Sequence, residues 1–265
     1  MEQLTNTKAL LDGTRPTETP VRDVGILPIK SDPARAWLRL NEVSIPSLAP
    51  VKTKVTPNAA AAFDLLRSRV LRQARKDGIR RLAITSPTPG CGATTVTAAL
   101  ALSLARQIDL KIMVFDLNLR SPGLSAEFAL SESVSRVSAL GRVRREFDSS
   151  ALRIGHNLAL SLITDPEPNP AELLGTVRSK EFLKQIEHEF EPDLILIDLP
   201  PVLPHDDFVA AADLFDAALM IARADHSTVD QIDRSERLMS EQKPCLGVVM
   251  NACRFSNHPE LGTQD

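Results

Sequence analysis

The segment Ser86-Pro-Thr-Pro-Gly-Cys-Gly-Ala-Thr-Thr95 has the composition of a loop that binds phosphate. It follows an apolar run, 82–85, and leads into a run typical of a helix, 96–105. In that setting backbone N–H groups and the positive end of the helix dipole face an anion. Such a loop usually ends in Gly-Lys-Ser/Thr, where the lysine neutralises the outer phosphates and the hydroxyl binds Mg²⁺. Here the end reads Gly92-Ala93-Thr94, so the lysine is missing and the hydroxyl is kept.

The loop and two carboxylates supply the candidate site residues. Phosphoryl transfer needs positioned phosphates, Mg²⁺, and a carboxylate that holds metal-bound water or deprotonates the acceptor. Asp116 and Asp198 each end an apolar, strand-like run. We therefore expect Mg²⁺ at Thr94, Asp116 and Asp198, and catalytic roles for the two aspartates. The residues expected to bind the nucleotide phosphates are Gly90, Cys91, Gly92, Ala93, Thr94 and Thr95.

Strand-like and helix-like segments alternate along the chain. Continuous apolar strands that alternate with helices indicate an α/β fold with a doubly wound, mostly parallel sheet covered on both faces. In such folds ligands bind beyond the carboxyl ends of the strands, where the loop and both aspartates fall. The predicted strands are 82–85, 111–116, 158–163, 193–198, 217–222 and 246–250. The predicted helices are 58–77, 94–107 and 179–190, with a further helix start at Asn169-Pro170.

The composition limits the remaining function classes. The chain has 265 residues, 43% of them hydrophobic, and a formal net charge of −3. These values favour one large α/β domain and make nucleic acid an unexpected partner. Three widely spaced cysteines favour a reducing compartment over a disulfide framework. The sequence has no signal-peptide pattern and no apolar run of about 20 residues, so we expect a cytoplasmic protein without a membrane span.

The sequence predicts three parts. Residues 1–55 are rich in proline and lack periodicity, which is typical of a flexible arm. Within this arm the only tryptophan, Trp37, would either dock a partner or fold back on the domain as a turn of helix. Residues 56–253 form the α/β domain, and residues 254–265 form a short polar tail. The first helix of the domain has a basic face, which includes Arg67, Arg72 and Arg75.

In combination, these motifs resemble the bacterial tyrosine kinases, or BY-kinases, of the CpsD/CapB type. The resemblance covers about residues 57–253, and its motifs are a P-loop at 89–94, an Asp-x-Asp-x-Arg element at 116–120 and a Walker B element at 196–201. It implies ATP or ADP with Mg²⁺ as cofactors and an adenine contact by Asn251. Arg120, which ends the second element, is a candidate to replace the missing lysine charge in catalysis.

Departures from the family pattern change the expected activity. Ala93 stands where the family has lysine, and Asn118 replaces the second acid of the Asp-x-Asp pair. Only Arg67 fits the Glu-x-x-Arg-x-x-Arg motif that the family uses for oligomerisation, and the chain has no tyrosine to form a C-terminal tyrosine cluster. A contact between the loop lysine and the outer phosphates, which Ala93 cannot make, typically lowers the barrier to phosphoryl transfer by about 3 kcal/mol. We therefore expect an ATP-binding relative with weakened or no kinase activity.

The resemblance also implies a pathway and a partner. BY-kinases regulate polymerisation and export of exopolysaccharide or capsule beside a membrane polysaccharide co-polymerase or export protein. Such a partner would recruit this chain to the inner face of the plasma membrane, and a homo-oligomer is compatible with the family. Two alternatives stay open. One is an active protein-tyrosine kinase or ATPase acting on other proteins; the other is a positioning ATPase of the chromosome-partitioning type, whose additional lysine would fall at Thr88.

Overall fold

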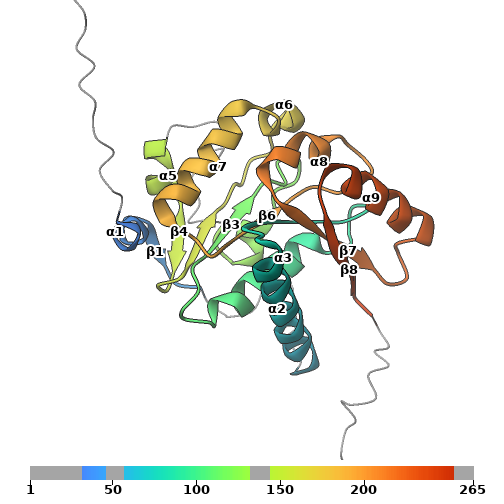
Figure 1. Ribbon diagram of the computed structural model, residues 1–265, viewed down its shortest axis with the longest axis horizontal. Coiled ribbons are helices and arrows are strands. Elements are labelled where there is room, and N and C mark those ends of the chain that lie inside the picture. Colours follow the sequence, from blue (N-terminus) through green and yellow to red (C-terminus); the bar gives the residue numbers. More distant parts are fainter. Residues whose placement is uncertain (1–31, 46–56, 132–143, 254–265) are drawn as a thin grey trace, which may run out of the picture. The chain divides into compact units, whose positions relative to one another are not determined.

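In the computed structural model, which describes residues 32–45, 57–131 and 144–253, eight strands form one sheet. Their order across the sheet is β1-β4-β5-β3-β6-β2-β7-β8 (Figure 1). The strands are β1 (Asn41–Val43), β2 (Arg81–Thr85), β3 (Ile112–Asp116), β4 (Leu152–Ile154), β5 (Leu158–Ser161), β6 (Leu194–Asp198), β7 (Ala217–Arg223) and β8 (Cys245–Asn251).

Neighbouring strands run parallel, except for the antiparallel pair β4 and β5. Every residue of the central strands β3 and β6 is buried. Burial on both faces explains why these strands read as almost continuous apolar runs in the sequence. The structure therefore confirms the predicted α/β fold with a doubly wound, mostly parallel sheet.

The helices divide between the two faces of the sheet (Figure 1). Alternate residues of β3 serve the two cores: Val114 packs in the core beneath α3, and Phe115 packs in the core beneath α7. On the first face lie α2 (Pro57–Asp77), α3 (Ala93–Ala105) and α4 (Leu124–Glu127). On the second face lie α1 (Pro33–Leu38), α5 (Arg144–Ser150), α6 (Pro170–Leu174), α7 (Val177–Phe190), α8 (Asp207–Ala210), the 3₁₀-helix η1 (Ala211–Leu214) and α9 (Val229–Gln242).

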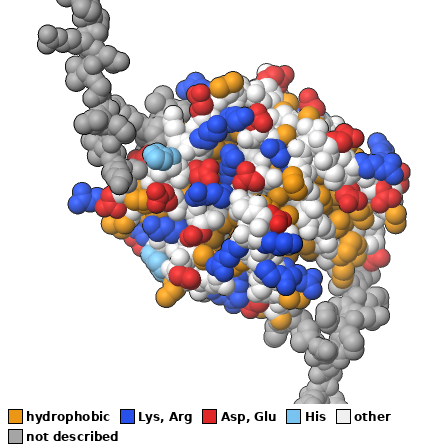
Figure 2. Space-filling model, in the orientation of Figure 1, with side chains coloured by type: hydrophobic (Ala, Val, Ile, Leu, Met, Phe, Trp, Pro, Cys, Tyr) orange, Lys and Arg blue, Asp and Glu red, His pale blue; other side chains and the backbone are white. Residues whose placement is uncertain are grey.

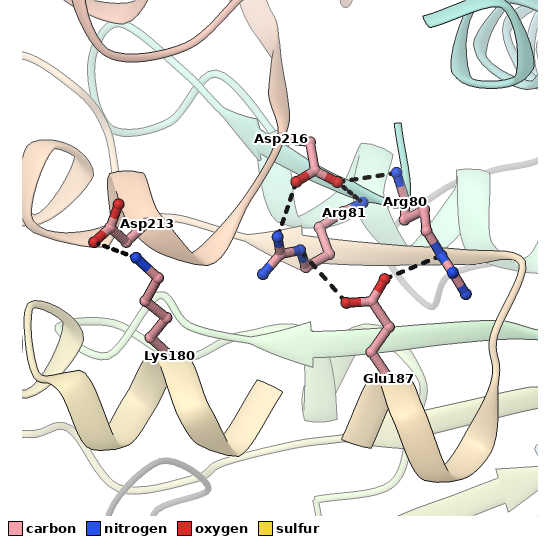
Figure 3. A network of polar contacts seen from close by, with 6 residues as sticks. All are labelled: Arg80, Arg81, Lys180, Glu187, Asp213 and Asp216. Atoms are coloured by element: carbon pink, nitrogen blue, oxygen red, sulfur yellow. Dashed lines mark hydrogen bonds and ion pairs between the residues drawn. The ribbon is translucent and has the colours of Figure 1, made fainter. Parts of the chain in front are cut away.

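An ion-pair network holds the amino end of β2 (Figure 3). The backbone N–H groups of Arg80 and Arg81 donate to Asp216 Oδ2 at 3.0 and 2.8 Å, and Arg81 Nη2 lies 2.9 Å from Asp216 Oδ1. From α7, Glu187 Oε1 lies 3.0 Å from Arg80 Nε. These contacts tie β2 to the start of β7 and to α7. They fix the strand whose opposite end carries the phosphate-binding loop.

Residues 33–43 are part of the domain, so the prediction of a flexible arm over 1–55 is wrong for this segment. Trp37 is 2% exposed, and its indole Nε1 donates to Phe190 O at 2.8 Å. The Trp37 and Phe190 rings meet edge to face with centroids 6.3 Å apart. After α1, strand β1 pairs in parallel with β4. The fold-back interpretation of Trp37 is confirmed, and its role as a docking anchor is excluded by its burial.

Sequence patterns miss this segment because its stabilising contacts are distant. A six-residue helix and a three-residue strand are too short to show periodicity. The partner of Trp37 in α7 lies 153 positions away in the chain. The rest of the predicted arm, 1–31 and 46–55, and the predicted tail, 254–265, lie outside the described residues, so the boundaries at 56 and 253 stay predictions.

Helix α9 was not predicted, although the sequence carries one signal for it. Thr228 Oγ1 accepts a hydrogen bond from Gln231 N, and Gln231 Oε1 accepts one from Thr228 N. This reciprocal pair is a capping box, which the spacing Thr-x-x-Gln indicates. The helix has few apolar residues: Met239 is buried, and Ile232 and Leu238 pack partly buried against the core.

Among the described residues, no helix combines the length and the apolar composition that a membrane crossing requires.

The first prediction concerns the stability that α1 contributes. Trp37→Ala removes a buried aromatic side chain and its hydrogen bond, so the free energy of unfolding should fall by about 3–5 kcal/mol. Leu38→Ala is the matched control, because Leu38 is the adjacent residue of α1 and is 72% exposed. Its effect should stay within about 0.5 kcal/mol. Urea denaturation followed by circular dichroism measures both; equal losses in the two variants would contradict the burial of Trp37.

Candidate functional site

A cleft lies beyond the carboxyl ends of β2, β3 and β6. Its volume is about 460 Å³, and three loops form its walls: the phosphate-binding loop after β2, the loop after β3 and the loop after β6. The lining residues from these loops and from α4 are Ser86, residues 89–95, Asn118, residues 120–123, Glu127, residues 199–201, Pro204 and His205. The parallel sheet thus brings the sequence-predicted loop and the ends of both aspartate strands to one place.

Two glycines shape the phosphate-binding loop. Gly90 has a φ of 83° and Gly92 a φ of 88°, in the left-handed region that favours glycine. A Cβ at Gly92 would also collide with Nδ2 of Asn251, the last residue of β8, so the Asn251 side chain would have to move. Helix α3 begins at Ala93, and the first hydrogen bond of the helix runs from Val96 N to Gly92 O at 2.9 Å. The loop therefore presents the amino end of a buried helix to the cleft.

Asp198 is buried beneath the first turn of α3. Its Oδ2 accepts a hydrogen bond from Thr94 Oγ1 at 2.7 Å, and its Oδ1 accepts one from Thr97 Oγ1 at 3.1 Å. Burial raises the pKa of Asp198 to about 7, although the two hydroxyl donors favour the ionised carboxylate. Thr97 was not among the predicted site residues, because its position one helical turn after Ala93 becomes relevant only when α3 packs on β6.

Asp116 lies beside Asp198, since the two residues are direct partners across the β3–β6 pair. Its Oδ2 accepts from Gly123 N at 3.2 Å and Leu124 N at 3.1 Å, and its Oδ1 accepts from Asn118 N at 3.3 Å. Burial, and then the charge of Asp198, raise the pKa of Asp116 well above its usual range. In this structure Asp116 shapes the loop after β3 and caps the start of α4.

Arg120 reaches the rim of the cleft but is held by a carboxylate. Its Nε donates to Asp207 Oδ2 at 2.6 Å and its Nη2 to Asp207 Oδ1 at 3.0 Å. Asp207 is fully buried, and its hydrogen bonds raise the pKa of Arg120. This bidentate pair offsets much of the positive charge that could replace the missing lysine. The sequence carries no signal for the pair, because Asp207 begins a four-residue helix far along the chain.

Two other polar residues contact the loop in ways that the sequence did not predict. Thr95 Oγ1 donates to Glu127 Oε1 at 2.8 Å, which places a buried carboxyl group of α4 on the cleft wall. Asn251 Nδ2 donates to Cys91 O at 2.9 Å, and Asn251 is not among the described residues that line the cleft. The expected adenine contact of Asn251 therefore stays a prediction.

The residues of the cleft fit a nucleotide phosphate with Mg²⁺. In the described part of the chain, no protein acceptor takes the N–H groups of Gly90, Cys91 and Gly92, so they are available to an anion. Thr94, Asp116 and Asp198 offer the hard oxygen ligands that Mg²⁺ prefers. Among the described residues, no group of three or more His, Cys, Asp or Glu side chains could hold a metal by itself. Bound Mg²⁺ would therefore depend on phosphate oxygens and water for the rest of its ligands.

Comparisons with known proteins identify the family. No protein-family model matches the sequence. The tyrosine-protein kinase YwqD of Bacillus subtilis (strain 168) is 28% identical over 189 residues, which cover 69% of this chain and 77% of YwqD. The crystal structure of the VpsO kinase domain superimposes with a TM-score of 0.61 at 26% identity, over 74% of this chain and 95% of that domain. These similarities support membership of this chain in the BY-kinase family.

Other members of the family are much longer. The putative tyrosine-protein kinase AmsA of Erwinia amylovora is 30% identical over 174 residues, which are 64% of this chain and 23% of AmsA. This BY-kinase chain therefore spans about a quarter of the length of AmsA. The similarity to the VpsO kinase domain supports the P-loop fold.

The second prediction follows from the burial of Asp198. A raised pKa means that the folded protein holds a proton which the unfolded chain releases above its ordinary pKa of about 4. The free energy of unfolding of the Mg²⁺-free protein should therefore fall as the pH rises from about 4 to about 7, by an amount on the order of 4 kcal/mol. Asp198→Asn cannot titrate and should lack this contribution, so it should gain stability relative to the native chain as the pH rises.

Urea denaturation of both proteins in EDTA, at about pH 5 and about pH 8, measures the effect. The difference between the two free energies of unfolding should change across this interval. A difference that stays constant would show that Asp198 titrates alike in the folded and unfolded chains.

Proposed function

We propose that this chain is a nucleotide-binding BY-kinase relative with weakened or no kinase activity, which acts in polymerisation and export of exopolysaccharide or capsule. One observation carries the proposal. The cleft keeps the glycine loop, the start of α3 and the Thr94–Asp198 hydrogen bond, while Ala93 takes the place of the lysine. The backbone N–H groups that would bind a phosphate are present. The lysine side chain that would neutralise the charge of the outer phosphates is absent.

The ligands are MgATP or MgADP. The N–H groups of residues 90–95 would bind the phosphates, with the amino end of α3 adding the favourable end of its dipole. Thr94 would be a direct Mg²⁺ ligand, and Asp116 and Asp198 would hold the metal directly or through water. When bound, Mg²⁺ neutralises phosphate charge. Its charge would also favour the ionised form of Asp198, whose burial otherwise favours the protonated carboxyl group.

Weak transfer is expected from the balance of charge around the phosphates. Glu127 lines the cleft, and the fully buried Asp116 and Asp198 accept hydrogen bonds from its lining residues Gly123 and Thr94. Among its described lining residues, Arg120 is the one Lys or Arg side chain, and Asp207 already pairs with it. Loss of one preorganised positive contact typically raises a barrier by about 3–4 kcal/mol. The native chain should therefore hold a nucleotide more readily than it transfers the phosphoryl group.

An active kinase or ATPase is the alternative, and one observation favours it. The Thr94–Asp198 pair and the neighbouring Asp116 retain the hydroxyl and carboxylates that phosphoryl transfer uses. Since the chain has no tyrosine, any tyrosine phosphorylation must occur on another protein. Robust transfer to tyrosines of an added protein, abolished by Asp198→Ala, would establish this alternative and overturn the weak-activity proposal.

The third prediction restores the missing charge. Ala93→Lys should tighten Mg-ADP binding by roughly 1–3 kcal/mol, the size of a charge-assisted hydrogen bond. Ala93→Met is the matched control, because methionine has a similar length and no charge. It should not tighten binding. Isothermal titration calorimetry of the native chain and both variants measures the affinities. A Kd of about 1 mM corresponds to a binding free energy of about −4 kcal/mol. If neither the native chain nor Ala93→Lys binds Mg-ADP at about millimolar concentration, the loop is not a nucleotide site.

The exposed basic face of α2 is the surface that we propose for recruitment by a membrane partner. Arg69, Arg72 and Arg75 are exposed, and Figure 2 shows Lys and Arg side chains gathered where α2 lies in Figure 1. Arg67, which the sequence placed on this face, is instead 17% exposed and pairs with Asp64 at 3.1 Å. The corrected docking face therefore excludes Arg67 as well as the buried Trp37. Its charge suits an acidic cytoplasmic segment of a polysaccharide co-polymerase or export protein.

The fourth prediction tests that surface. Arg72→Glu combined with Arg75→Glu should release the protein from the membrane fraction of polysaccharide-producing cells, because the reversed charges repel an acidic segment. Arg178→Glu combined with Lys184→Glu makes the same change in net charge on exposed positions of α7 and should leave the association intact. Fractionation and co-purification measure the distribution. If the native chain stays soluble and alone, and its deletion leaves polysaccharide output unchanged, both partner and pathway are wrong.

A further inference from the structure

The phosphate-binding loop is held from its outer side by three side chains. Three consecutive carbonyl oxygens of the loop each accept a hydrogen bond from a residue outside it. The donors come from the end of β7, the loop that follows β7, and the end of β8. The pairs are Arg223 Nη1 with Gly90 O at 3.0 Å, His226 Nε2 with Pro89 O at 3.2 Å, and Asn251 Nδ2 with Cys91 O at 2.9 Å. We call Arg223, His226 and Asn251 the loop clamp.

The clamp sets the direction of the loop's N–H groups. In a planar trans peptide the carbonyl and the following N–H point in opposite directions, and the described chain has no cis peptide bond. Carbonyls turned outward toward the clamp therefore turn the N–H groups of Gly90, Cys91 and Gly92 to the other side. That side is the cleft, since these three residues line it and the clamp residues do not. The orientation that an anion requires is thus imposed from behind the loop.

The clamp is itself held in place by hydrogen bonds. Arg223 N donates to Ser227 Oγ at 3.0 Å, and Ala224 N donates to Asn251 O at 3.0 Å. Ala252 N donates to Asn251 Oδ1 at 2.8 Å, which leaves Asn251 Nδ2 as the group that faces the loop. The segment after β7 and the end of β8 therefore form one connected support. A fixed support matters because Gly90 and Gly92 would otherwise allow the loop many conformations.

The need for such a support is greater in this chain than in a loop with its lysine. A lysine at position 93 would attract the phosphates whatever the exact direction of each N–H group, whereas Ala93 leaves binding to the backbone. Donors that are already oriented bind an anion without the entropy cost of ordering the loop. Arg223 also places a positive charge next to the Gly90 carbonyl, on the outer side of the loop.

We propose that Arg223, His226 and Asn251 are positioning residues, which preorganise the loop so that its N–H groups bind nucleotide phosphates without a lysine. The choice of ligand rests on the proposed function. The hold on the loop does not, because Cys91 reports on it without any ligand. Cys91 is 1% exposed, and its Sγ lies 3.4 Å from Ser227 Oγ, between the loop and its support.

The first arm of the experiment measures the rate at which Cys91 reacts with the thiol reagent DTNB. The full chain carries Cys245→Ser and Cys253→Ser, so Cys91 is its only thiol. Arg223→Ala and Asn251→Ala should each raise the rate roughly five- to tenfold, as expected when the loss of one hydrogen bond favours local opening. Arg223→Lys keeps a donor and should restore most of the protection. Arg237→Ala removes an exposed arginine of α9 that is not part of the loop clamp, so it should leave the rate unchanged.

The second arm measures Mg-ADP affinity by calorimetry in the Ala93→Lys background and in the native chain. Arg223→Ala and Asn251→Ala should weaken binding roughly five- to tenfold, with rescue by Arg223→Lys and no effect of Arg237→Ala. Urea denaturation of each variant separates these local effects from a loss of global stability. Because the clamp should act on a formed loop, the free energies of unfolding should change much less than the reactivity of Cys91.

The outcomes distinguish the two proposals. If Cys91 reactivity does not change in either alanine variant, the clamp does not hold the loop and the inference is wrong. If Cys91 becomes reactive while Mg-ADP affinity is unchanged, the clamp has a structural role only and the positioning role is overturned. If neither the native chain nor Ala93→Lys binds Mg-ADP, the proposed function fails and the nucleotide part of the inference fails with it, while the Cys91 rates still decide whether the clamp exists.

Discussion

Asp198 connects the carboxyl end of β6 to the first turn of α3, and the rest of the cleft depends on this contact. The carboxyl group accepts hydrogen bonds from Thr94 and Thr97 while burial disfavours its charge. Two hydroxyl donors do not fully compensate the carboxylate for its removal from water, so the pKa of Asp198 is raised. A bound divalent cation would favour the ionised carboxylate. The same contact fixes the first turn of α3 against the end of β6.

Two sets of contacts, one at each end of β2, hold this strand and the loop that follows it. At the amino end of β2, Arg81 pairs with Asp216, which ties β2 to the start of β7. At the carboxyl end, the clamp ties the loop after β2 to the ends of β7 and β8. Contacts to β7 and its neighbour β8 therefore hold β2 and the loop that follows it at both ends of the strand. Ala93 can be tolerated in such an arrangement, because the backbone geometry does not rely on the missing side chain.

The charges around the cleft are the physical basis of the proposed loss of kinase activity. Ala93 and Asn118 leave these two positions without the lysine and the second acid that the resemblance leads us to expect. Arg120 remains at the rim, but its partner Asp207 is buried and accepts hydrogen bonds from both Nε and Nη2 of the guanidinium group. Redirecting Arg120 to a phosphate would leave that carboxylate buried without its ion pair, which is costly. Binding can therefore persist under conditions in which transfer is slow.

Sequence patterns determined six of the eight described strands, all but the three-residue β1 and β4, together with the phosphate-binding loop and the two aspartates that end β3 and β6. These features are local: apolar runs, a glycine-rich turn and a carboxylate at a strand end all lie within a few residues of one another. Parallel pairing then requires the strand ends to meet at one edge, so convergence of the loop with Asp116 and Asp198 also follows from the sequence.

The tertiary structure decided the rest, because the deciding contacts join residues far apart in the chain. Trp37 is buried by Phe190, and Arg120 is held by Asp207, at separations of 153 and 87 positions. The clamp is likewise invisible in the sequence, since Arg223 and Asn251 meet the loop only after β7 and β8 have joined the sheet. Local patterns specify which groups end each strand, but three-dimensional packing selects the partner that each group meets.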